Sequence, residues 1–202
     1  RHPLTKVVVE VKRYLGDVII DLGQSQGRAF VDAYLDSEPN RLDEKFRAAL
    51  FHHTGGHALF VVELLRAMQE RGDLVQDSTG VWEMGTTLDW NELPDRAEAV
   101  IEERINRLPD DLRQMLQAAS VQGENFAGEV VAQVQEADAR QVVQRLNSEL
   151  VRRHRLLLDQ GQERVGLARL SRFSFQNQLF QQYLYHSLNQ AERSYLHEDI
   201  AG

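Results

Sequence analysis

Apolar residues recur every three or four positions along most of the chain, and this period is typical of amphipathic helices. One buried stripe is expected from Leu59, Val62, Leu65 and Met68, in a helix that ends at Gly72. Further helical patterns cover residues 4–15, 25–38, 41–54, 100–108, 109–119, 126–134, 139–150, 179–184 and 190–200. The sequence therefore predicts a mainly α fold.

Extended patterns in the first half of the chain are short. Residues 18–22 are rich in β-branched side chains and are followed by Gly23, which favours one buried strand. Residues 74–76 and 81–83 lie on either side of a turn that contains Gly80, so they predict a small hairpin.

The second half changes from a helical to an extended period near residue 155. Residues 155–158 and 164–167 are expected to form a hairpin around a turn at Gln160 and Gly161, and residues 172–175 are a candidate third strand. Helices followed by a small β-hairpin are the order of elements in a winged helix-turn-helix module. Asp138 is expected to cap the helix at residues 139–150, and Asn40 is expected to cap the helix at residues 41–54.

Chain length and a break in the helical pattern predict two main units. A chain of 202 residues is long for one small domain, and Leu93-Pro94-Asp95 interrupts the helical pattern near its middle. Because a helical pattern is still running at residue 202, we expect the chain to be a segment of a longer protein.

Composition narrows the class of protein. The formal net charge of −8 opposes nonspecific binding to nucleic acid or to an anionic membrane. The absence of cysteine favours a reducing compartment, which predicts a cytoplasmic protein. No apolar run is long enough to span a membrane. Adjacent histidines at 52 and 53 point in different directions on a helix, so we expect no shared metal ion.

Catalytic motifs are missing from this sequence. It contains no GxxxxGK(S/T) loop for a triphosphate, no GxGxxG, no GxSxG and no HExxH. Its adjacent acids, such as Glu102 and Glu103, are typical of solvated helix faces. We therefore expect no enzymatic activity and no catalytic residue in this chain.

The glycine pair Gly55-Gly56 stands directly before a strongly apolar helix. Such a turn allows a ligand to approach the backbone, and the N–H groups at a helix start favour an anion, so the pair is a candidate phosphate contact. The alternative is that Gly55 only ends the preceding helix and Gly56 only turns the chain.

Arginines are concentrated in the second half of the chain, so DNA binding is an alternative function. The basic residues are Arg140, Arg145, Arg152, Arg153, His154, Arg155, Arg164, Arg169 and Arg172. However, no aromatic residue is interleaved with them, and apolar residues leave only one polar face on the helix. We expect a protein contact rather than nucleic acid, and keep a DNA-binding winged-helix transcriptional regulator as the alternative function.

The succession of motifs resembles the STAND branch of AAA+ P-loop ATPases, specifically bacterial regulators of the adenylate-cyclase-associated and transcriptional-activator type. Residues 54–65 resemble the lid motif TxGNPLFVxELL of that family, and residues 93–109 resemble LPxxxxxVIxxRIxRLP. Residues 173–185 resemble YxFxHxLFQQYLY, and residues 2–16 resemble the stretch that leaves the ATPase core. The resemblance covers essentially the whole chain.

The resemblance implies a division of the chain and a function. Residues 1–23 would be the end of the ATPase core, 24–92 a helical lid with a small hairpin, 93–186 a winged-helix domain and 187–202 the start of a C-terminal helical region. The implied function is a non-catalytic regulatory module of a nucleotide-switched signal-transduction ATPase, in which lid and winged helix control the closed, ADP-bound and the open, ATP-bound states.

The resemblance also implies site residues and partners. Its nucleotide-contacting positions fall on Gly56, His57 and Ala58 in the lid and on Asn177 in the winged helix. Ala58 stands where the family has proline, and Asn177 where it has histidine. The implied cofactor is ATP or ADP in the full-length protein, with no tight binding to this segment alone. The implied partners are an upstream P-loop core, C-terminal helical repeats and further copies of the protein on activation.

Overall fold

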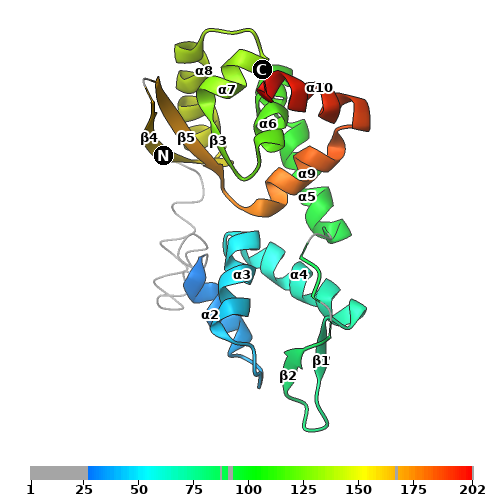
Figure 1. The fold of residues 1–202 in the computed structure, drawn as a ribbon. Helices are drawn as coiled ribbons and strands as arrows, with labels where there is room; N and C mark the ends of the chain where they lie inside the picture. The colour runs from blue at the N-terminus through cyan, green and yellow to red at the C-terminus, as the bar shows by residue number, and fades with distance from the viewer. Residues whose placement is uncertain (1–26, 87, 91–92, 167, 202) are drawn as a thin grey trace, which may run out of the picture.

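The computed structural model describes residues 27–86, 88–90, 93–166 and 168–201 (Figure 1). It is mainly helical and has small antiparallel sheets of two and three strands, which confirms the predicted fold class. The helix expected at residues 4–15 and the strand expected at 18–22 lie outside the described residues. Across the described part, no helix combines the length and the apolar character that a membrane span requires.

Within the described residues, the lower unit in Figure 1 consists of three helices and a hairpin. Its elements are α2 (Arg28–Leu35), α3 (Glu44–Thr54), α4 (Ala58–Arg71), β1 (Leu74–Gln76) and β2 (Trp82–Met84). The two strands pair antiparallel, as the sequence predicted. The helices enclose a hydrophobic cluster made of Val31, Leu35, Leu42, Phe46, Leu50, Val61, Leu64, Leu65, Met68 and Leu74.

Two local expectations for the lower unit were wrong. The side chain of Asp43, rather than Asn40, caps α3 by accepting a hydrogen bond from the Phe46 N–H at 2.9 Å. Asn40 instead accepts from Leu42 N–H and so holds the turn before the helix. In α4, the fully buried positions include Phe60 and Val61 rather than Leu59 and Val62, because this helix contacts both units and buries two faces.

The upper unit in Figure 1 contains the remaining helices and a three-stranded sheet. Its elements are α5 (Asp95–Asn106), α6 (Asp110–Gln122), β3 (Asn125–Ala127), α7 (Gly128–Val134), α8 (Ala139–Arg145), the π-helix η1 (Leu146–Arg153), β4 (Leu157–Val165), β5 (Ala168–Phe175), α9 (Gln178–Ser187) and α10 (Gln190–Ala201). The succession α6, β3, α7, α8, β4, β5 is that of a winged helix, and Asp138 caps α8 as expected.

The sheet differs from its prediction in two ways. The turn expected at Gln160 and Gly161 is wrong, because β4 continues through these residues with a register shift between Asp159 and Gly161. A glycine inside a strand pattern often marks such a bulge. The long hairpin turns near Gly166, which has φ 61°. The third strand is β3, which pairs with β5 in the order β3-β5-β4.

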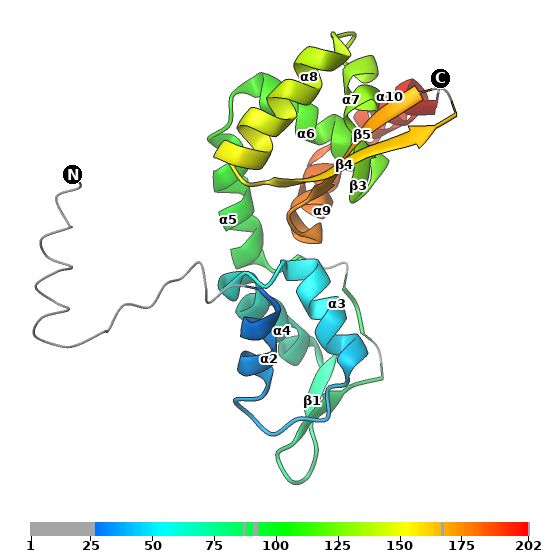
Figure 2. The ribbon, with the colours of Figure 1, turned by 90° about the vertical axis from the view of Figure 1, so that its left-hand side faces the viewer.

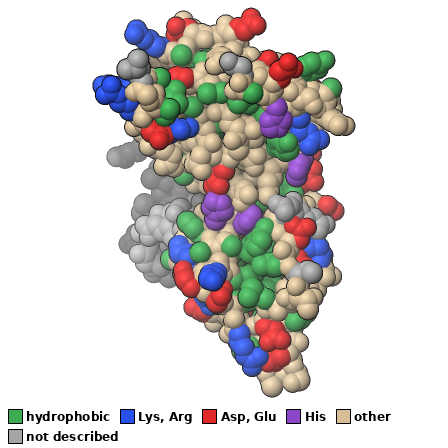
Figure 3. Space-filling model, in the orientation of Figure 1, with side chains coloured by type: hydrophobic (Ala, Val, Ile, Leu, Met, Phe, Trp, Pro, Cys, Tyr) green, Lys and Arg blue, Asp and Glu red, His purple; other side chains and the backbone are tan. Residues whose placement is uncertain are grey.

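The two units meet where α3 and α4 contact α5 and α9 (Figure 2). Phe60 of α4 belongs to the hydrophobic cluster of the upper unit, and its ring lies 6.0 Å from that of Phe180 in an edge-to-face arrangement. On the surface, His52 Nε2 lies 3.0 Å from a carboxylate oxygen of Glu124. Figure 3 shows some histidine side chains near the level where the units meet and others over the upper unit. The predicted domain boundary near residue 93 stays a prediction.

Candidate functional site

A cavity of about 330 Å³ lies where the two units meet. We name it the joint cavity, and its lining residues are Thr54, Gly55, His57, Arg104, Arg155, Gln176, Asn177 and Phe180. Two of the predicted site residues, His57 and Asn177, therefore line the same space although they are far apart in sequence. Gly56 and Ala58 do not line it.

The turn at Gly55 brings the lower unit against the upper one. Gly55 ends α3 in the left-handed conformation, with φ 60°, and its N–H donates to Phe51 O at 2.7 Å. A Cβ atom built on Gly55 would lie 2.9 Å from Gln176 O and 3.3 Å from Asn177 Cβ. A side chain at this position would therefore collide with backbone of the upper unit, as well as straining the turn.

Gly56 and Ala58 have structural surroundings of their own. Gly56 O accepts a hydrogen bond from Gly27 N–H at 3.1 Å, and a Cβ built on Gly56 would lie 2.4 Å from Gly27 Cα. Gly56 thus allows two backbone segments of the lower unit to touch. Ala58 is the first residue of α4, directly after its N-cap residue His57.

Asn177 is buried and begins helix α9. Its Oδ1 accepts a hydrogen bond from Phe180 N–H at 3.2 Å, and only 4% of the residue is exposed. The amide nitrogen remains on the side of Gly55, since Nδ2 would lie 3.8 Å from a Cβ at that glycine. The capping bond thus uses the oxygen of the side chain and leaves an N–H donor group toward the turn.

His57 contributes a neutral imidazole to the joint cavity. Burial lowers the pKa of His57 below its usual value of 6.5, and the positive charge of Arg104 lowers it further. The ring lies 4.6 Å from the ring of Phe60, and its buried Nδ1 atom has no hydrogen-bond partner. This nitrogen has almost no accessible surface, so it is a buried polar group without a partner rather than part of the open cavity wall.

The joint cavity is also lined by two arginines, which were not among the site residues predicted from the sequence. Arg104 of α5 donates to His154 O at 3.0 Å, and its guanidinium carbon lies 5.1 Å from the centre of the Phe180 ring. Burial lowers the pKa of Arg104 below its usual value. Arg155 follows η1 in a left-handed conformation with φ 53°. Arg104 lies in the stretch 93–109 and Arg155 lies outside the motif stretches, so the sequence gave no signal that they would meet.

The charges of the joint cavity are one-sided. Neither Asp nor Glu is among its lining residues, and neither guanidinium forms an ion pair with a carboxylate of the described part of the chain. Guanidinium groups bind phosphate oxygens with paired, charge-assisted hydrogen bonds. The donor set of the cavity therefore fits an anionic oxygen ligand such as a phosphate group.

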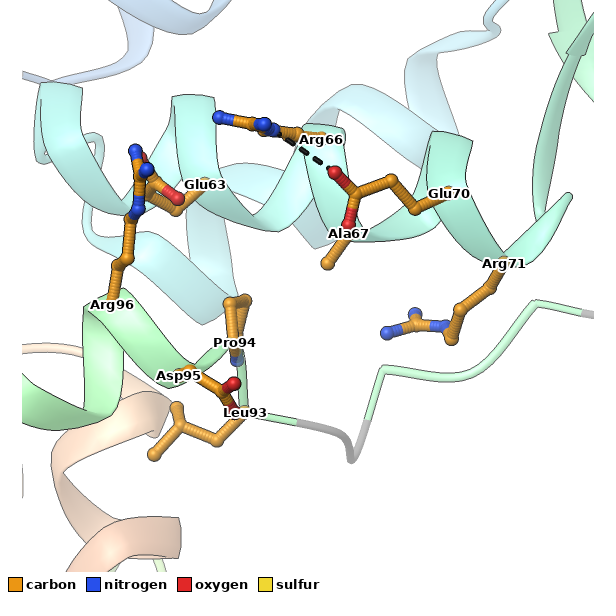
Figure 4. Close-up of a pocket in the computed structure, with 9 residues that line it drawn as sticks. All are labelled: Glu63, Arg66, Ala67, Glu70, Arg71, Leu93, Pro94, Asp95 and Arg96. Carbon is orange, nitrogen blue, oxygen red and sulfur yellow. Dashed lines mark hydrogen bonds and ion pairs between the residues drawn. The ribbon is translucent and has the colours of Figure 1, made fainter.

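A second cavity, of about 360 Å³, lies between α4 and the start of α5 (Figure 4). Its walls are Glu63, Arg66, Ala67, Glu70, Arg71, Leu93, Pro94, Asp95 and Arg96. We name it the α4–α5 cavity. Each arginine in it has an acidic partner: Arg66 with Glu70 at 3.0 Å, Arg96 with Glu63 at 3.4 Å and Arg71 with Asp73 at 2.7 Å.

The adjacent histidines of α3 have separate surroundings. His53 is buried and stacks on Trp90, with ring centres 4.7 Å apart, whereas His52 is half exposed and faces Glu124. Burial, together with the nearby charge of His52, lowers the pKa of His53 to about 4. In the described ranges, no group of three or more His, Asp or Glu side chains is arranged to hold a metal ion.

A scan against models of protein families found no match to this chain, and searches of curated proteins and of solved structures found none either.

Proposed function

We propose that this chain is the regulatory module of a nucleotide-switched signal-transduction ATPase, in which the lower unit acts as a lid and the winged helix closes against it. The observation that carries the proposal is that His57 and Asn177 line one cavity at the contact of the two units. Both positions were singled out by motifs that lie in separate parts of the sequence.

The residues of the joint cavity suit the phosphate end of a nucleotide. Arg104 and Arg155 offer positive charge, Asn177 offers N–H groups, and His57 contributes an imidazole ring to the wall. ATP and ADP would supply the signal through their difference of one phosphate. Because this chain has no P-loop, an upstream ATPase core in the same protein is the proposed partner that completes the site.

The contacts between the units allow a switch of moderate energy. The His52–Glu124 pair is partly exposed, with 52% and 26% of the two side chains accessible, so it contributes at most about 1 kcal/mol. Phe60 and Phe180 supply a further apolar contact. In the proposed open state these contacts are lost, and the exposed faces become available to C-terminal helices or to other copies of the protein.

The test is the rate of ADP release from the longer protein that carries this chain behind its core. The variant Asn177→Asp keeps an oxygen acceptor for Phe180 N–H but places a negative charge at the joint cavity. We expect ADP release at least about tenfold faster, because a carboxylate repels phosphate. The matched control is Asn189→Asp, since Asn189 caps Glu192 N–H in the same way and does not line the cavity. Equal release from both variants and the parent protein would contradict the proposal.

A second experiment tests whether the core is required. The chain alone should bind a fluorescent ADP analogue only weakly, because it presents one side of the proposed site. Binding with micromolar affinity would show instead that the described units form a complete nucleotide site by themselves.

A DNA-binding transcriptional regulator remains the second candidate function. It is favoured by the tip of the β4–β5 wing, where Arg164 and Arg169 are direct cross-strand partners. Other arginines are neutralised, because Arg145 pairs with Asp111, Arg153 with Glu149 and Arg172 with Glu163. A mobility shift with random duplex DNA that weakens as salt rises would support this candidate, and no shift at low salt would exclude it.

A further inference from the structure

We propose that a pocket in the lower unit binds a small alkylated ammonium ion, the class of ligand to which choline belongs. The pocket lies between α2, the loop that follows α2, α4 and the β1–β2 hairpin, and its volume is about 190 Å³. We name it the hairpin pocket. It shares no lining residue with the joint cavity, so this inference goes beyond the proposed function and does not depend on it.

The buried part of the pocket wall is apolar. It consists of four leucines that are each at most 7% exposed, namely Leu35, Leu42, Leu65 and Leu74. Leucine side chains offer no hydrogen bond, so a strongly hydrated cation such as sodium would lose its water there without replacement. A ligand of this pocket therefore needs an apolar surface. The volume suits a head group of about six atoms, since one water molecule takes up about 30 Å³.

Two aromatic residues also line the hairpin pocket, Tyr34 of α2 and Trp82 of β2. The faces of tryptophan and tyrosine rings attract cations, and tryptophan does so most strongly. The backbone holds Trp82 in place, because its N–H donates to Pro39 O at 2.9 Å and its carbonyl accepts from Arg41 N–H at 2.8 Å. The indole ring therefore lies in the wall of a pocket that is formed before a ligand binds.

The charge of the hairpin pocket is negative. Of the described residues that line it, Glu38 is the only acid, and none is Lys, Arg or His. Glu38 Oε2 accepts a hydrogen bond from Trp82 Nε1 at 2.6 Å, so the carboxylate is held beside the indole ring. The neighbouring Arg41 pairs instead with Asp77 at 2.8 Å and with Glu83 at 3.2 Å. Within the described part of the chain, Glu38 therefore has no counter-ion.

An alkylated ammonium ion matches the leucines, the aromatic rings and the carboxylate together. It spreads its positive charge over methyl groups, which can pack against leucine side chains and aromatic faces without needing hydrogen bonds. Its charge also balances that of Glu38 at the mouth of the pocket. A neutral ligand would leave this carboxylate without a counter-ion, and an anion would be repelled by it. The class of ligand is thus opposite in charge to that proposed for the joint cavity.

The experiment is a titration of the chain with choline at constant ionic strength, followed by the fluorescence of Trp82. The chain has two tryptophans, so the background variant Trp90→Phe leaves Trp82 as the single reporter and keeps a ring against His53. We expect a saturable change in emission that weakens as salt rises, because Glu38 is exposed. The neutral isostere 3,3-dimethyl-1-butanol has carbon in place of the ammonium nitrogen and should bind about tenfold more weakly.

Two variants and a matched control assign the binding to this pocket. Glu38→Gln keeps an oxygen acceptor for the indole N–H but removes the charge, so choline affinity should fall about fivefold. Tyr34→Leu keeps an apolar wall but removes a ring, and a similar loss is expected. The matched control is Glu83→Gln, which removes a carboxylate one residue from Trp82 that does not line the pocket. This control should leave choline affinity unchanged.

Three results would overturn the inference: no saturable change with choline, equal affinities for choline and its neutral isostere, or equal affinities in Glu38→Gln and the parent chain. Weaker binding of phosphocholine than of choline would support it with a free amine as the ligand. Equal binding of the two would support it with a phosphocholine head group as the ligand. The ADP-release test acts on Asn177 in the joint cavity, so either proposal can fail while the other stands.

Discussion

The two cavities have nearly the same volume and both contain arginines, yet their charges are arranged in opposite ways. In the α4–α5 cavity every arginine has an acidic partner within 3.4 Å, so the wall is neutral. Figure 4 marks the pair of Arg66 with Glu70. In the joint cavity the arginines face a neutral imidazole and a buried amide. The difference teaches that the volume of a cavity does not distinguish these two sites, whereas the balance of charge in their walls does.

The largest expected effect comes from removing the apolar contact beneath the joint cavity. Phe60 is fully buried and links α4 to the core of the upper unit. Phe60→Ala should lower the free energy of unfolding by about 3–5 kcal/mol, measured by urea denaturation. Glu70→Ala in the α4–α5 cavity should cost less than about 1 kcal/mol, because its ion pair is exposed. Similar costs at both sites would mean that α4 is not anchored at the joint.

Substitutions at two glycines test the cost of a side chain at a helix end with and without a neighbouring unit. Gly55 and Gly72 both end helices in the left-handed conformation, but only at Gly55 would a Cβ meet backbone of the upper unit. Gly72→Ala should cost about 1 kcal/mol for the strained conformation. Gly55→Ala should cost about 3 kcal/mol in thermal or urea unfolding, because Gln176 O must also move. Equal costs would show that the units do not pack as described.

Low pH should destabilise the chain through His53, which lies in α3, the helix that ends at Gly55. The pKa of this buried imidazole is lowered to about 4 in the folded state, against 6.5 when it is free in the unfolded chain. The stability that neutral His53 contributes is therefore complete above pH 6.5 and is lost as the pH falls toward 4. The loss should reach about 3 kcal/mol.

The measurement for His53 is urea unfolding at a series of pH values. His53→Phe keeps an aromatic ring against Trp90 but does not titrate. The difference in stability between this variant and the parent chain should therefore grow as the pH falls from 6.5 to 4. A difference that stays constant over this range would show that His53 is solvated and titrates normally.

The smallest effect concerns Ala58, where proline stands in the resembling family. Ala58 is the first residue of α4, and His57 before it is extended, with φ −72° and ψ 119°. Proline suits both features, so Ala58→Pro should raise the free energy of unfolding by about 0.5–1 kcal/mol. A loss of stability would contradict the described start of the helix. In the longer protein, the same variant should slow ADP release if the turn contacts nucleotide.

The sequence predicted those features that depend on neighbouring residues. Gly55 as the end of a helix, Asp138 as a cap and the β1–β2 hairpin all follow from local propensity, and the structure contains each of them. Helical periodicity likewise predicted the fold class. These features need no knowledge of which segments meet in space.

Long-range pairing accounts for what the sequence did not predict. Strand β3 has only three residues and exists because it pairs with β5, far along the chain. The joint cavity could be expected only in part: motif positions pointed to His57 and Asn177, but nothing local indicates that Arg104 and Arg155 lie beside them. The burial of α4 on two faces has the same origin, since Phe60 packs into the other unit.

A pyrophosphate titration followed by nuclear magnetic resonance tests the central claim most directly. Backbone and side-chain signals near the joint cavity should shift together and saturate with one affinity, with the largest changes at His57, Arg104, Arg155 and Asn177. Signals of Arg66 and Arg96, in the neutral α4–α5 cavity, should stay in place. Shifts of equal size at both cavities, or none at the joint cavity, would contradict the account.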